Sequence, residues 1–403
     1  MTLYVIGGGV AGLSAAVTGA AAGENVCLIE AAPRAGGRCR SFDDPVLGCR
    51  IDNGSHVLIG ANPAALAYLE QIGARGSLMS LGENGIPFAD LESGARWTFR
   101  SGRPVPGVGL PAHLAALRLV FPVTGRTVGA VLPDDLLMRR FWEPLTVAAL
   151  NTAPGRADAG LLRAILGEIL RHGRSGLDLY MARDGLSESF VDPAVAWLRQ
   201  RGARVEPGQP VRAFRTDGAR ITAIVLPDRE LALDAGDRLV LATPQNVTAR
   251  LLPGVTVPLG SNSIVNGHFR LEPGPLFRDA PPVMGLCGGT GQWLFRRGDV
   301  LSVTVSDAGA LLPLDQAEVA DILWRDVAWA LGLPAVPVPP CRIVREKRAT
   351  FDQTPANQRL RPATRTAWSN LFFAGDWTAT GLPATIEGAI RSGRDAARLA
   401  ARV

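Results

Sequence analysis

The chain opens with segments whose order predicts a strand, a tight turn, a helix and a second strand. Leu3 to Ile6 is an apolar run, and an alanine-rich segment of helical composition follows it to Ala22. Gly23 to Asn25 interrupts that helix, and Val26 to Ile29 is the next apolar run. Two short apolar runs on either side of a helical segment predict a β-α-β unit with parallel strands.

Later apolar runs predict the other strands that such a sheet requires. Residues 203–205, 238–242 and 371–374 predict further strands of the parallel type. Residues 211–214 and 220–226 flank Asp217-Gly218 and predict a hairpin. Because these runs are far apart in the chain, we predict a discontinuous first domain. Its expected parts are residues 1–60, 186–254 and 341–403.

The two intervening blocks, residues 61–185 and 255–340, predict a second domain. Helical apolar spacing in the first block covers residues 63–72, 110–121, 133–150 and 159–171. The second block predicts an antiparallel sheet, a closing helix over 315–331 and a proline-rich linker over 334–340; its strands are expected at 263–271, 283–286, 292–295 and 301–305. The predicted fold class is therefore α/β, a Rossmann-like domain with a discontinuous α+β domain.

The turn after the first strand has a glycine spacing that suits a dinucleotide. Gly7 permits a sharp turn, Gly9 lets the backbone approach a pyrophosphate, and Gly12 lets the helix pack close to the strand. The helix that starts at Val10 and Ala11 offers free N–H groups and a positive dipole end to the phosphates. We therefore predict that the turn and the first helical residues bind a cofactor.

An acidic residue and a second glycine pair favour FAD over NAD as that cofactor. Glu30 stands eighteen residues past Gly12 and is placed to accept hydrogen bonds from a ribose diol. The run Arg34-Ala35-Gly36-Gly37-Arg38 adds backbone N–H groups and a guanidinium for the phosphates of a long cofactor. Gly36, Gly37 and Arg38 are therefore predicted FAD contacts together with Glu30.

The last apolar run ends in a second candidate half of the same site. Gly375 and Asp376 follow Phe372-Phe373-Ala374, where an open α/β sheet places ligand-binding groups. Asp376 can bond a ribityl hydroxyl, and the loop ending at Thr385 opens a helix at Ile386 whose dipole favours a reduced flavin. No histidine or cysteine occurs between residues 372 and 389, so we predict that FAD is bound non-covalently.

Composition indicates a globular enzyme. Of 403 residues, 47% are hydrophobic and 20% are charged, and no apolar stretch reaches the length of a transmembrane helix. The first strand begins within two residues of the N-terminus, which leaves no room for a signal peptide. The five cysteines form no CxxC pair and have no clustered histidines near them. We therefore expect reduced thiols, no metal site and a cytoplasmic protein.

Charge gives little evidence for a macromolecular partner, with one exception. The net charge is +5 and the pI is about 9.3, but the arginines form no run, so we expect no nucleic-acid binding. Residues 110–123 are an apolar stretch broken only by His113 and Arg118. We favour a buried helix of the second domain there. The alternative is an interfacial helix in peripheral contact with an anionic inner-membrane surface.

Further motifs complete a resemblance that covers the whole chain. They are DNGSHVLIG (residues 52–60), FWEPL (141–145), ALNT (149–152), HFRL (268–271), QWLF (292–295), RATF (348–351) and GDWTATG (375–381). With both halves of the FAD site, they resemble the flavin amine oxidase and phytoene desaturase superfamily. Within it the chain is most similar to the squalene-associated, FAD-dependent desaturase-like enzymes of bacterial hopanoid pathways.

That resemblance implies an activity, partners and further cofactor contacts. The activity is reductive removal of the hydroxyl group of hydroxysqualene, a hydrophobic isoprenoid, through hydride transfer to an allylic cation, to give squalene. Upstream enzymes of the squalene pathway are the implied protein partners. The implied FAD contacts beyond the glycine motifs are Ala31, Gly54, Ser55, His56 and Val211.

The implied reaction needs a proton donor for the leaving oxygen, and three residues are candidates. His56 could protonate the hydroxyl near neutral pH, and a structural histidine is the alternative. Glu143, followed by Pro144 in an apolar helix, is either an acid of raised pKa or a buried partner of an arginine. Asn53 is a further catalytic candidate, although loop formation together with Asp52 is the role we favour for it.

The remaining candidates have a core role as their favoured interpretation. His268, on the predicted antiparallel sheet, could take part in proton transfer but is expected to pack in the core. Four aromatic residues could stabilise a cation through their faces, although aromatic residues at such spacing are commonly core: Trp142, Trp293, Phe295 and Trp377.

Two other flavoenzyme activities and a non-enzymatic flavoprotein are the alternative functions. Amine oxidases of the superfamily commonly carry a lysine on the substrate-domain strand, whereas residues 263–271 contain none and Lys347 lies elsewhere. A carotenoid or phytoene desaturase shares the apolar substrate but moves electrons in the opposite direction. The missing lysine therefore argues against an amine oxidase, the desaturase is the closer alternative, and the dehydroxylation is what the family resemblance implies.

Overall fold

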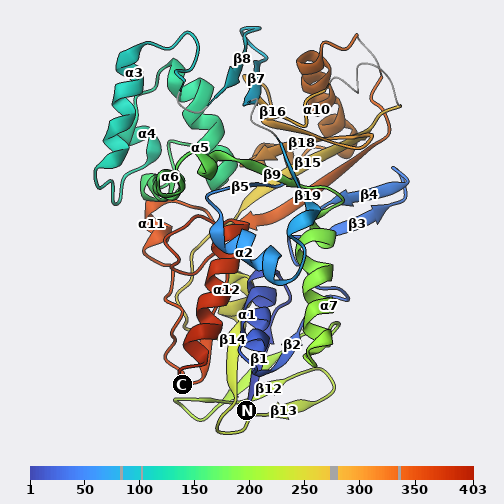
Figure 1. The fold of residues 1–403 in the computed structure, drawn as a ribbon, viewed down its shortest axis with the longest axis vertical. Helices are drawn as coiled ribbons and strands as arrows, with labels where there is room; N and C mark the ends of the chain where they lie inside the picture. Colours follow the sequence, from blue (N-terminus) through green and yellow to red (C-terminus); the bar gives the residue numbers. More distant parts are fainter. Residues whose placement is uncertain (82–84, 101–102, 273–279, 335–336) are drawn as a thin grey trace.

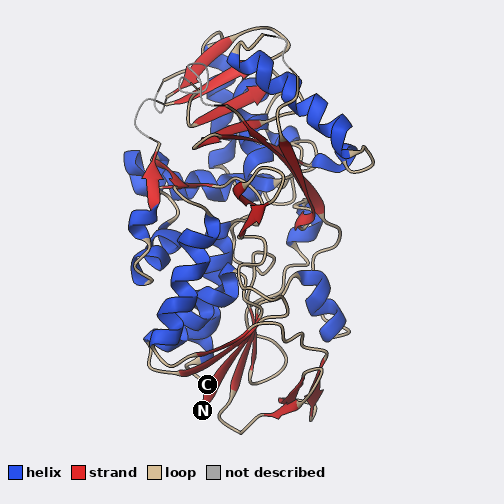
Figure 2. Cartoon of the chain, turned by 90° about the vertical axis from the view of Figure 1, so that its right-hand side faces the viewer, coloured by secondary structure: helices blue, strands red, loops and turns tan. Residues whose placement is uncertain are grey.

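A five-stranded parallel sheet forms the layer that lies beside both chain termini (Figures 1 and 2). The computed structural model describes residues 1–81, 85–100, 103–272, 280–334 and 337–403. The strand order is β10, β2, β1, β14 and β20, and each neighbouring pair is parallel. Their bounds are Arg204–Glu206, Asn25–Ile29, Thr2–Ile6, Arg238–Leu241 and Leu371–Phe373. The predicted α/β class is confirmed, because strands from distant parts of the chain build one sheet.

Strand β1 is apolar throughout because both faces of this sheet are covered. Leu3 and Val5 belong to one buried core cluster, and Tyr4 and Ile6 belong to another on the opposite face. Burial on both faces is the usual reason that strands of parallel sheets are continuous apolar runs. The helices that contribute to the first cluster are α1 (Val10–Ala21), α2 (Pro63–Gln71), α7 (Asp192–Gln200) and α12 (Ile386–Ala400).

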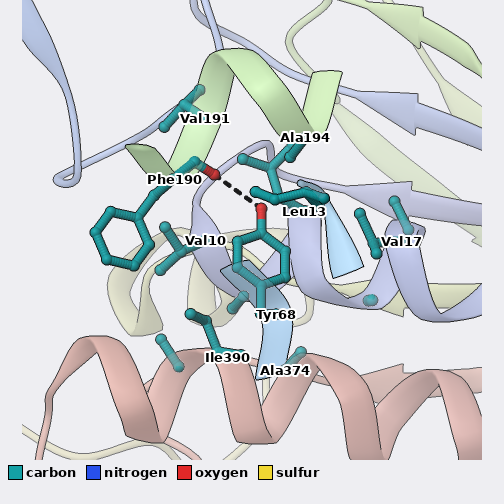
Figure 3. Close-up of a cluster of buried hydrophobic side chains, with 14 of the residues drawn as sticks. Val10, Leu13, Val17, Tyr68, Phe190, Val191, Ala194, Ala374 and Ile390 are labelled. Carbon is teal, nitrogen blue, oxygen red and sulfur yellow. Dashed lines mark hydrogen bonds between the residues drawn. The ribbon is translucent and has the colours of Figure 1, made fainter. Parts of the chain in front are cut away.

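Helices from the two ends of the chain meet in that first cluster (Figure 3). Helix α12 lies so close to α1 that a Cβ atom on Gly393 would stand 1.9 Å from the Ala11 carbonyl oxygen. Tyr68 of α2 points between them, and its hydroxyl donates a hydrogen bond of 2.8 Å to the Phe190 carbonyl. The N-terminal and C-terminal halves of the predicted cofactor site are thereby held together.

The opposite face of the parallel sheet is covered by a small antiparallel sheet. It consists of β11 (Ala213–Thr216), β12 (Ile221–Val225) and β13 (Glu230–Ala232). The predicted hairpin corresponds to β11 and β12, and β13 was not predicted from the sequence because it is only three residues long. Ile221 and Ile224 of β12 are buried against the sheet.

A seven-stranded mixed sheet forms the second layer, at the end of the molecule opposite the termini (Figure 2). Helix α10 (Gln316–Leu331) packs on it and begins with a capping box, in which the side chains of Asp315 and Glu318 bond each other's backbone N–H groups. The strand order is β19 (Cys341–Thr350), β15 (Asn262–Arg270), β18 (Val300–Ser306), β17 (Trp293–Arg297), β16 (Val283–Cys287), β7 (Ile86–Asp90) and β8 (Arg96–Phe99). The four predicted strands and the closing helix are all present.

The structure corrects the predicted boundary between the two domains at residue 341. Strand β19 pairs along its length with β15 and therefore belongs to the seven-stranded sheet. The strand was not predicted from the sequence because its apolar residues are mixed with arginines, as is usual for a strand that is only partly buried. The block predicted to be helical likewise contributes β7 and β8, and β7 runs parallel to β16. Of the predicted linker, residues 335–336 lie outside the described residues.

The helical part of the second layer lies beside this sheet (Figure 1). The predicted helix over 133–150 begins three residues later, at Leu136, because the Asp135 carboxylate accepts hydrogen bonds from the N–H groups of Leu137 and Met138 and caps the helix there. The elements are α3 (Leu110–Ala115), η2 (Ala116–Val120), α4 (Val128–Val131), η3 (Met138–Trp142), α5 (Glu143–Leu150) and α6 (Ala159–His172).

Two small antiparallel sheets complete the described fold. One pairs β3 (Ser41–Asp44) with β4 (Cys49–Asp52), and the other has the order β5 (Val57–Ile59), β9 (Leu179–Ala182) and β6 (Leu78–Ser80). The loop over residues 53–56 joins β4 to β5. The remaining short elements are η1 (Arg75–Ser77), η4 (Gly173–Leu177), η5 (Ser187–Val191), α8 (Gln245–Leu251), η6 (Ala308–Leu311) and α11 (Pro355–Gln358).

None of the helices within the described ranges combines the length and the apolar character that crossing a membrane requires.

Candidate active site

The glycine-rich turn between β1 and α1 has the geometry that its sequence predicts. Gly7 has φ +104°, and a Cβ atom there would lie 2.7 Å from the Ala242 carbonyl oxygen. A Cβ atom on Gly12 would lie 1.8 Å from the Gly7 carbonyl oxygen, whereas one on Gly9 would meet nothing within 4 Å. Gly7 and Gly12 therefore serve the packing of strand and helix, and Gly9 leaves open space where a pyrophosphate would approach.

The second glycine pair lies directly against this turn. The Gly36 N–H donates to the Gly8 carbonyl over 2.8 Å, and Gly36 and Gly37 have φ of +122° and +57°. Residues with a Cβ atom rarely adopt such backbone angles. Glu30 accepts hydrogen bonds from the N–H groups of Gly8 and Ala32. The two glycine-rich segments and the predicted ribose-binding acid therefore form one continuous surface.

Ala31 and Val211, which the family resemblance implies as cofactor contacts, belong to segments that run side by side. The N–H groups of Gly208 and Gln209 donate to the carbonyl oxygens of Ala32 and Glu30 over 2.9 Å and 2.8 Å. The start of the hairpin is thus fixed next to the predicted ribose-binding residue. The geometry fits the expected contacts, which remain predictions.

An ion pair joins the two halves of the predicted FAD site. Arg38 Nη2 lies 2.8 Å from Asp376 Oδ1, and Arg38 Nη1 donates to the Ala349 carbonyl. Burial by itself lowers the pKa of Arg38, but the Asp376 carboxylate more than compensates and the net pKa is raised. The guanidinium therefore remains charged beside the terminal half-site, as phosphate binding requires.

Arg361, which the sequence reasoning missed, fixes the loop after Asp376. Its guanidinium is buried and donates to the carbonyl oxygens of Asp376, Thr378 and Leu382 over 3.1, 2.8 and 2.8 Å. Burial lowers the pKa of Arg361 to about 10. No local sequence signal identifies this residue, because its partners are backbone atoms some fifteen to twenty-one residues away.

The start of helix α12 is capped and carries its own buried carboxylate. The Thr385 hydroxyl accepts from the Gly388 N–H over 3.1 Å. Glu387 lies in the first turn, accepts from the N–H groups of Ala64 and Ala65, and pairs with Arg391. These contacts hold the segment that contains the predicted flavin contacts Thr385 and Ile386.

A pocket lies between the loop over residues 53–56 and the seven-stranded sheet. Its apolar wall is formed by Met181, Ala182, Leu186, Phe295 and Val300, and its polar groups are Asp52, Ser55, His56, His268, Arg297 and Ser302. The pocket adjoins the predicted cofactor site, because the Asn53 side chain, in the same loop, donates to the Arg38 carbonyl over 3.4 Å. The two histidines that the sequence singled out therefore share one pocket.

His56 has the geometry of a group that can exchange protons. Its Nδ1 lies 3.0 Å from the Gly54 carbonyl oxygen, and because a carbonyl only accepts, Nδ1 carries the proton. The ring is exposed, although protein atoms surround most of the residue, and this partial burial lowers the pKa of His56 despite opposing effects of Gly54 and Asp52. Its Nε2 therefore has a free lone pair in the neutral form.

His268 contributes a more deeply buried ring to the same pocket. It is 1% exposed, its Nδ1 lies 2.8 Å from the Ser302 hydroxyl oxygen, and its Nε2 has no hydrogen-bond partner among the described residues. Burial lowers the pKa of His268 to about 4. The expectation of a core residue is right about burial but incomplete, because the ring also lines the pocket.

The charged residues of the pocket are already paired. Asp52 forms an ion pair with Arg297 and accepts hydrogen bonds from the Ser41 hydroxyl and the Leu186 N–H. Asn53 is buried, and its amide contacts Arg38 and Glu346 rather than the pocket. Its structure fits the loop-forming role, and it is absent from the residues that line the pocket.

The structure corrects the prediction that Glu143 is buried. Glu143 is exposed in the first turn of α5, whereas Pro144 beside it is buried. The sequence was misleading because a single acidic residue among apolar ones can face solvent at a helix start, where the dipole favours it. Of the aromatic candidates, Phe295 lines the pocket, and Trp142 and Trp377 pack in core clusters away from it.

This arrangement defines a flavin-dependent oxidoreductase. The model of the family described as flavin containing amine oxidoreductase matches residues 10–120 and 123–401. The chain belongs to that family, and within it to the hydroxysqualene dehydroxylases, as three relatives of nearly the same length show. The predicted family and the flavin cofactor are thereby confirmed.

The relatives named hydroxysqualene dehydroxylase come from three bacteria. The protein of Sinorhizobium fredii is 40% identical over 99% of this chain and 98% of its own length. The protein of Rhodopseudomonas palustris is also 40% identical, with the same coverage. The protein of Zymomonas mobilis is 37% identical over 98% of each chain.

Solved structures of the same fold are more distant in sequence. An oxidoreductase from Methanosarcina mazei superposes with a TM-score of 0.76 at 17% identity, covering 98% of this chain and 99% of its own. Cyclohexylamine oxidase from Brevibacterium oxydans gives a TM-score of 0.74 at 17% identity, covering 100% and 98%. At such identities the likeness establishes the fold alone.

Proposed function

We propose that this protein uses non-covalently bound FAD to remove the allylic hydroxyl group of hydroxysqualene reductively and form squalene. The name and the full-length similarity of the three bacterial relatives support the substrate. The observation in the structure that carries the chemistry is the pocket with His56 and His268 in an otherwise apolar and charge-paired wall.

The residues that would hold FAD form two groups that meet at the Arg38–Asp376 ion pair. The first group comprises the turn over residues 7–12, Glu30, Ala31 and the glycine pair at 36–37, with Val211 nearby. The second comprises Gly375, Asp376, Thr385 and Ile386. Gly54, Ser55 and His56 would then lie between the cofactor and the pocket. No histidine or cysteine occurs in residues 372–389, which supports non-covalent binding.

Bound in its reduced form, FAD supplies the hydride that makes the new C–H bond and is itself oxidised by two electrons. The substrate loses its C–O bond, and the hydroxyl group takes one proton and leaves as water. The chain must therefore deliver that proton, keep bulk water out and offer no nucleophile to an allylic cation.

His56 is the residue that would deliver the proton. In its neutral form Nδ1–H is engaged with Gly54, so only the doubly protonated ring can donate from Nε2. A lowered pKa makes that imidazolium a stronger acid, and the exposure of the ring allows it to take up a new proton from water.

The paired carboxylate and the apolar residues of the pocket would protect the cation. Asp52 is the one carboxylate among the described lining residues, and its ion pair with Arg297 and its two hydrogen bonds occupy its oxygens. Leu186, Phe295 and Val300 supply apolar surface, and the face of Phe295 can stabilise positive charge.

The experiment that tests this function is an anaerobic single-turnover reaction. The protein with reduced FAD and hydroxysqualene in detergent is expected to release squalene while the flavin absorbance of the oxidised form returns. Oxidised FAD without a reductant should give no product. The proposal fails if no squalene forms, and oxidation of an amine or desaturation of phytoene by the same preparation would assign one of the alternative activities.

The role of His56 is tested by replacing it with alanine. His56→Ala is expected to retain FAD and lower the turnover number about 100-fold, which is a typical effect of losing a general acid. The wild-type turnover number should rise as the pH falls from about 8 to about 6, because the imidazolium fraction grows, and the variant should lose this dependence. His172→Ala, on α6 and outside the pocket, is the matched control. Unchanged turnover in His56→Ala would return His56 to a structural role.

A further inference from the structure

An unusual apolar surface lies on the helical part of the second layer. Twelve large apolar residues of the described chain are exposed, and five of them fall within residues 110–121. Their exposed fractions are between 54% and 70%. We call this set the 110–121 face; its members are Leu110, Leu114, Leu117, Val120 and Phe121. The structure therefore contradicts the favoured expectation that this stretch is fully buried.

The 110–121 face is one side of a well-anchored segment. Leu110, Leu114 and Leu117 follow the four- and three-residue spacing that places side chains on one side of a helix, and Phe121 directly follows the end of η2. The opposite side is fixed to the protein, because Leu119 is 3% exposed and Ala112 and Ala116 pack against the core of the helical part. The exposed residues thus belong to α3, to η2 and to the residue that follows η2.

The same region carries an excess of positive charge. Between Glu92 and Asp134 the sequence contains five arginines and no acidic residue. The chain has 42 basic and 37 acidic residues in total, so the rest of the chain is formally neutral and the whole net charge of +5 belongs to this segment. The formal net charge of the chain is therefore carried by the stretch of sequence that contains the apolar face.

Individual arginines border the 110–121 face closely. Arg118 lies within it and is exposed. Arg163 of α6 is exposed, and its guanidinium donates to the Val120 carbonyl over 3.4 Å. Arg103 is exposed two residues before Val105, whose N–H bonds His113 of α3 over 3.1 Å. Three exposed arginines therefore belong to the 110–121 face or to segments that are bonded to it.

We propose that the 110–121 face is a docking surface for an anionic phospholipid bilayer, into which the leucines and Phe121 insert. Apolar residues bordered by arginines match the two features of such a surface, an acyl interior and a negative headgroup layer. Figure 1 places α3 at the outer edge of the molecule, away from the parallel sheet, so the face can meet a flat surface. The inference rests on the proposed function in one respect: a thirty-carbon substrate and product partition into a bilayer, and docking would let them enter without crossing water.

Vesicle flotation of the full-length, FAD-loaded protein tests this docking directly. The protein is expected to float with vesicles of phosphatidylcholine and phosphatidylglycerol, and roughly ten-fold less with vesicles of phosphatidylcholine alone. Added sodium chloride should release it, because exposed charges are screened. Wild-type protein that fails to bind the anionic vesicles would overturn the proposal.

Two sets of substitutions separate the apolar from the charged contribution. Leu114→Ser with Leu117→Ser and Phe121→Ser should lower binding to anionic vesicles roughly ten-fold or more. Arg103→Gln with Arg118→Gln should remove most of the preference for anionic lipid. Leu259→Ser, at an exposed leucine elsewhere (66% exposed), is the matched control and should bind as the wild type does. Undiminished binding by the triple variant contradicts the proposal.

Two further measurements distinguish the bilayer from a protein occupant and separate docking from catalysis. Sedimentation velocity detects a second copy of the chain as occupant: a wild-type dimer that the triple variant loses would assign the face to self-association. Turnover of hydroxysqualene in detergent should be equal in the triple variant and the wild type, because none of these residues belongs to the pocket. Absence of squalene from both would refute the proposed function, whereas the vesicle result would still decide the docking.

Discussion

The predicted cofactor-binding region and the pocket beside it are built on opposite principles. In the cofactor region the glycines lie in short segments, and their residue type has a local backbone reason, such as the positive φ of Gly7 and Gly36. In the pocket, His56, His268 and Leu186 come from separate elements and meet only in the folded chain. The first region is therefore readable from spacing, and the second requires the tertiary structure.

The difference extends to how each region tolerates change. A glycine in the turn is constrained by backbone atoms that cannot move aside, whereas the pocket groups are constrained by side-chain pairing and by loss of water. Substitutions at Gly7 and Gly12 should therefore act on folding and cofactor together. Those in the pocket should act on protonation and turnover while leaving the fold in place.

The largest expected effect breaks the turn itself. Gly12→Ala places a Cβ atom 1.8 Å from the Gly7 carbonyl oxygen and should lower the free energy of unfolding by about 3 kcal/mol, with loss of FAD. Gly9→Ala is the matched control, since a Cβ atom there meets nothing within 4 Å. It should leave the flavin-free protein unchanged in urea unfolding but bind FAD roughly ten-fold more weakly. Equal destabilisation by both substitutions would show that Gly9 also serves the packing of strand and helix, and not only the approach of the cofactor.

In the pocket, an effect of similar size on the free energy of unfolding is expected from the titration of His268. The pKa of His268 is lowered by burial to about 4, whereas an unfolded histidine titrates near 6.5, so the unfolded state binds the additional proton as the pH falls. The stability that neutral His268 contributes is therefore full above about 6.5 and decreases by about 3 kcal/mol as the pH falls to about 4.

His268→Gln isolates this contribution. The amide can still bond Ser302 but does not titrate. As the pH falls from about 6.5 to about 4, the free energy of unfolding of the wild type should therefore decrease relative to that of the variant. Urea unfolding at several pH values measures it. A difference that stays constant with pH would mean that His268 is not held neutral by the fold.

A smaller effect is expected from the contact that closes the first core. Tyr68→Phe removes the hydroxyl that bonds the Phe190 carbonyl over 2.8 Å and leaves a buried acceptor without its partner. The free energy of unfolding should fall by about 1 to 2 kcal/mol, measured by urea unfolding, with FAD content unchanged. Loss of FAD in this variant would show that the packing of α2 also governs the cofactor site.

The smallest effect is expected at Glu143, which lies outside both the predicted cofactor region and the pocket. Glu143→Gln replaces an exposed carboxylate in the first turn of α5 and should change the free energy of unfolding by less than about 1 kcal/mol. The turnover number should stay close to that of the wild type. A loss as large as that expected for His56→Ala would place Glu143 in the chemistry after all.

Several features of the fold were predictable because local sequence reports them directly. The β-α-β unit, the strands of the antiparallel sheet and helix α10 all have strong apolar periodicity or a cap. Strand β19 was not predictable in the same way, since its sequence CRIVREKRAT alternates poorly and only its pairing with β15 defines it. The exposed face over residues 110–121 was misjudged because hydropathy reports apolar character and not orientation.

Some residues of the candidate site were likewise predictable from the sequence, and others were not. Glycine spacing, Glu30, Arg38 and Asp376 were identifiable because each stands in a short motif directly after a predicted strand or turn, whereas the ion pair between Arg38 and Asp376 is visible only in the structure. Arg361 escaped notice because it bonds backbone carbonyls of a distant loop, and Glu143 was overrated because burial cannot be read from neighbours in the sequence. The sequence by itself determined the geometry of the glycine-rich turns, because steric limits on glycine act over a few residues. Only the tertiary structure decided which polar groups line the pocket and which apolar groups face outward, because burial and pKa depend on atoms that distant segments supply.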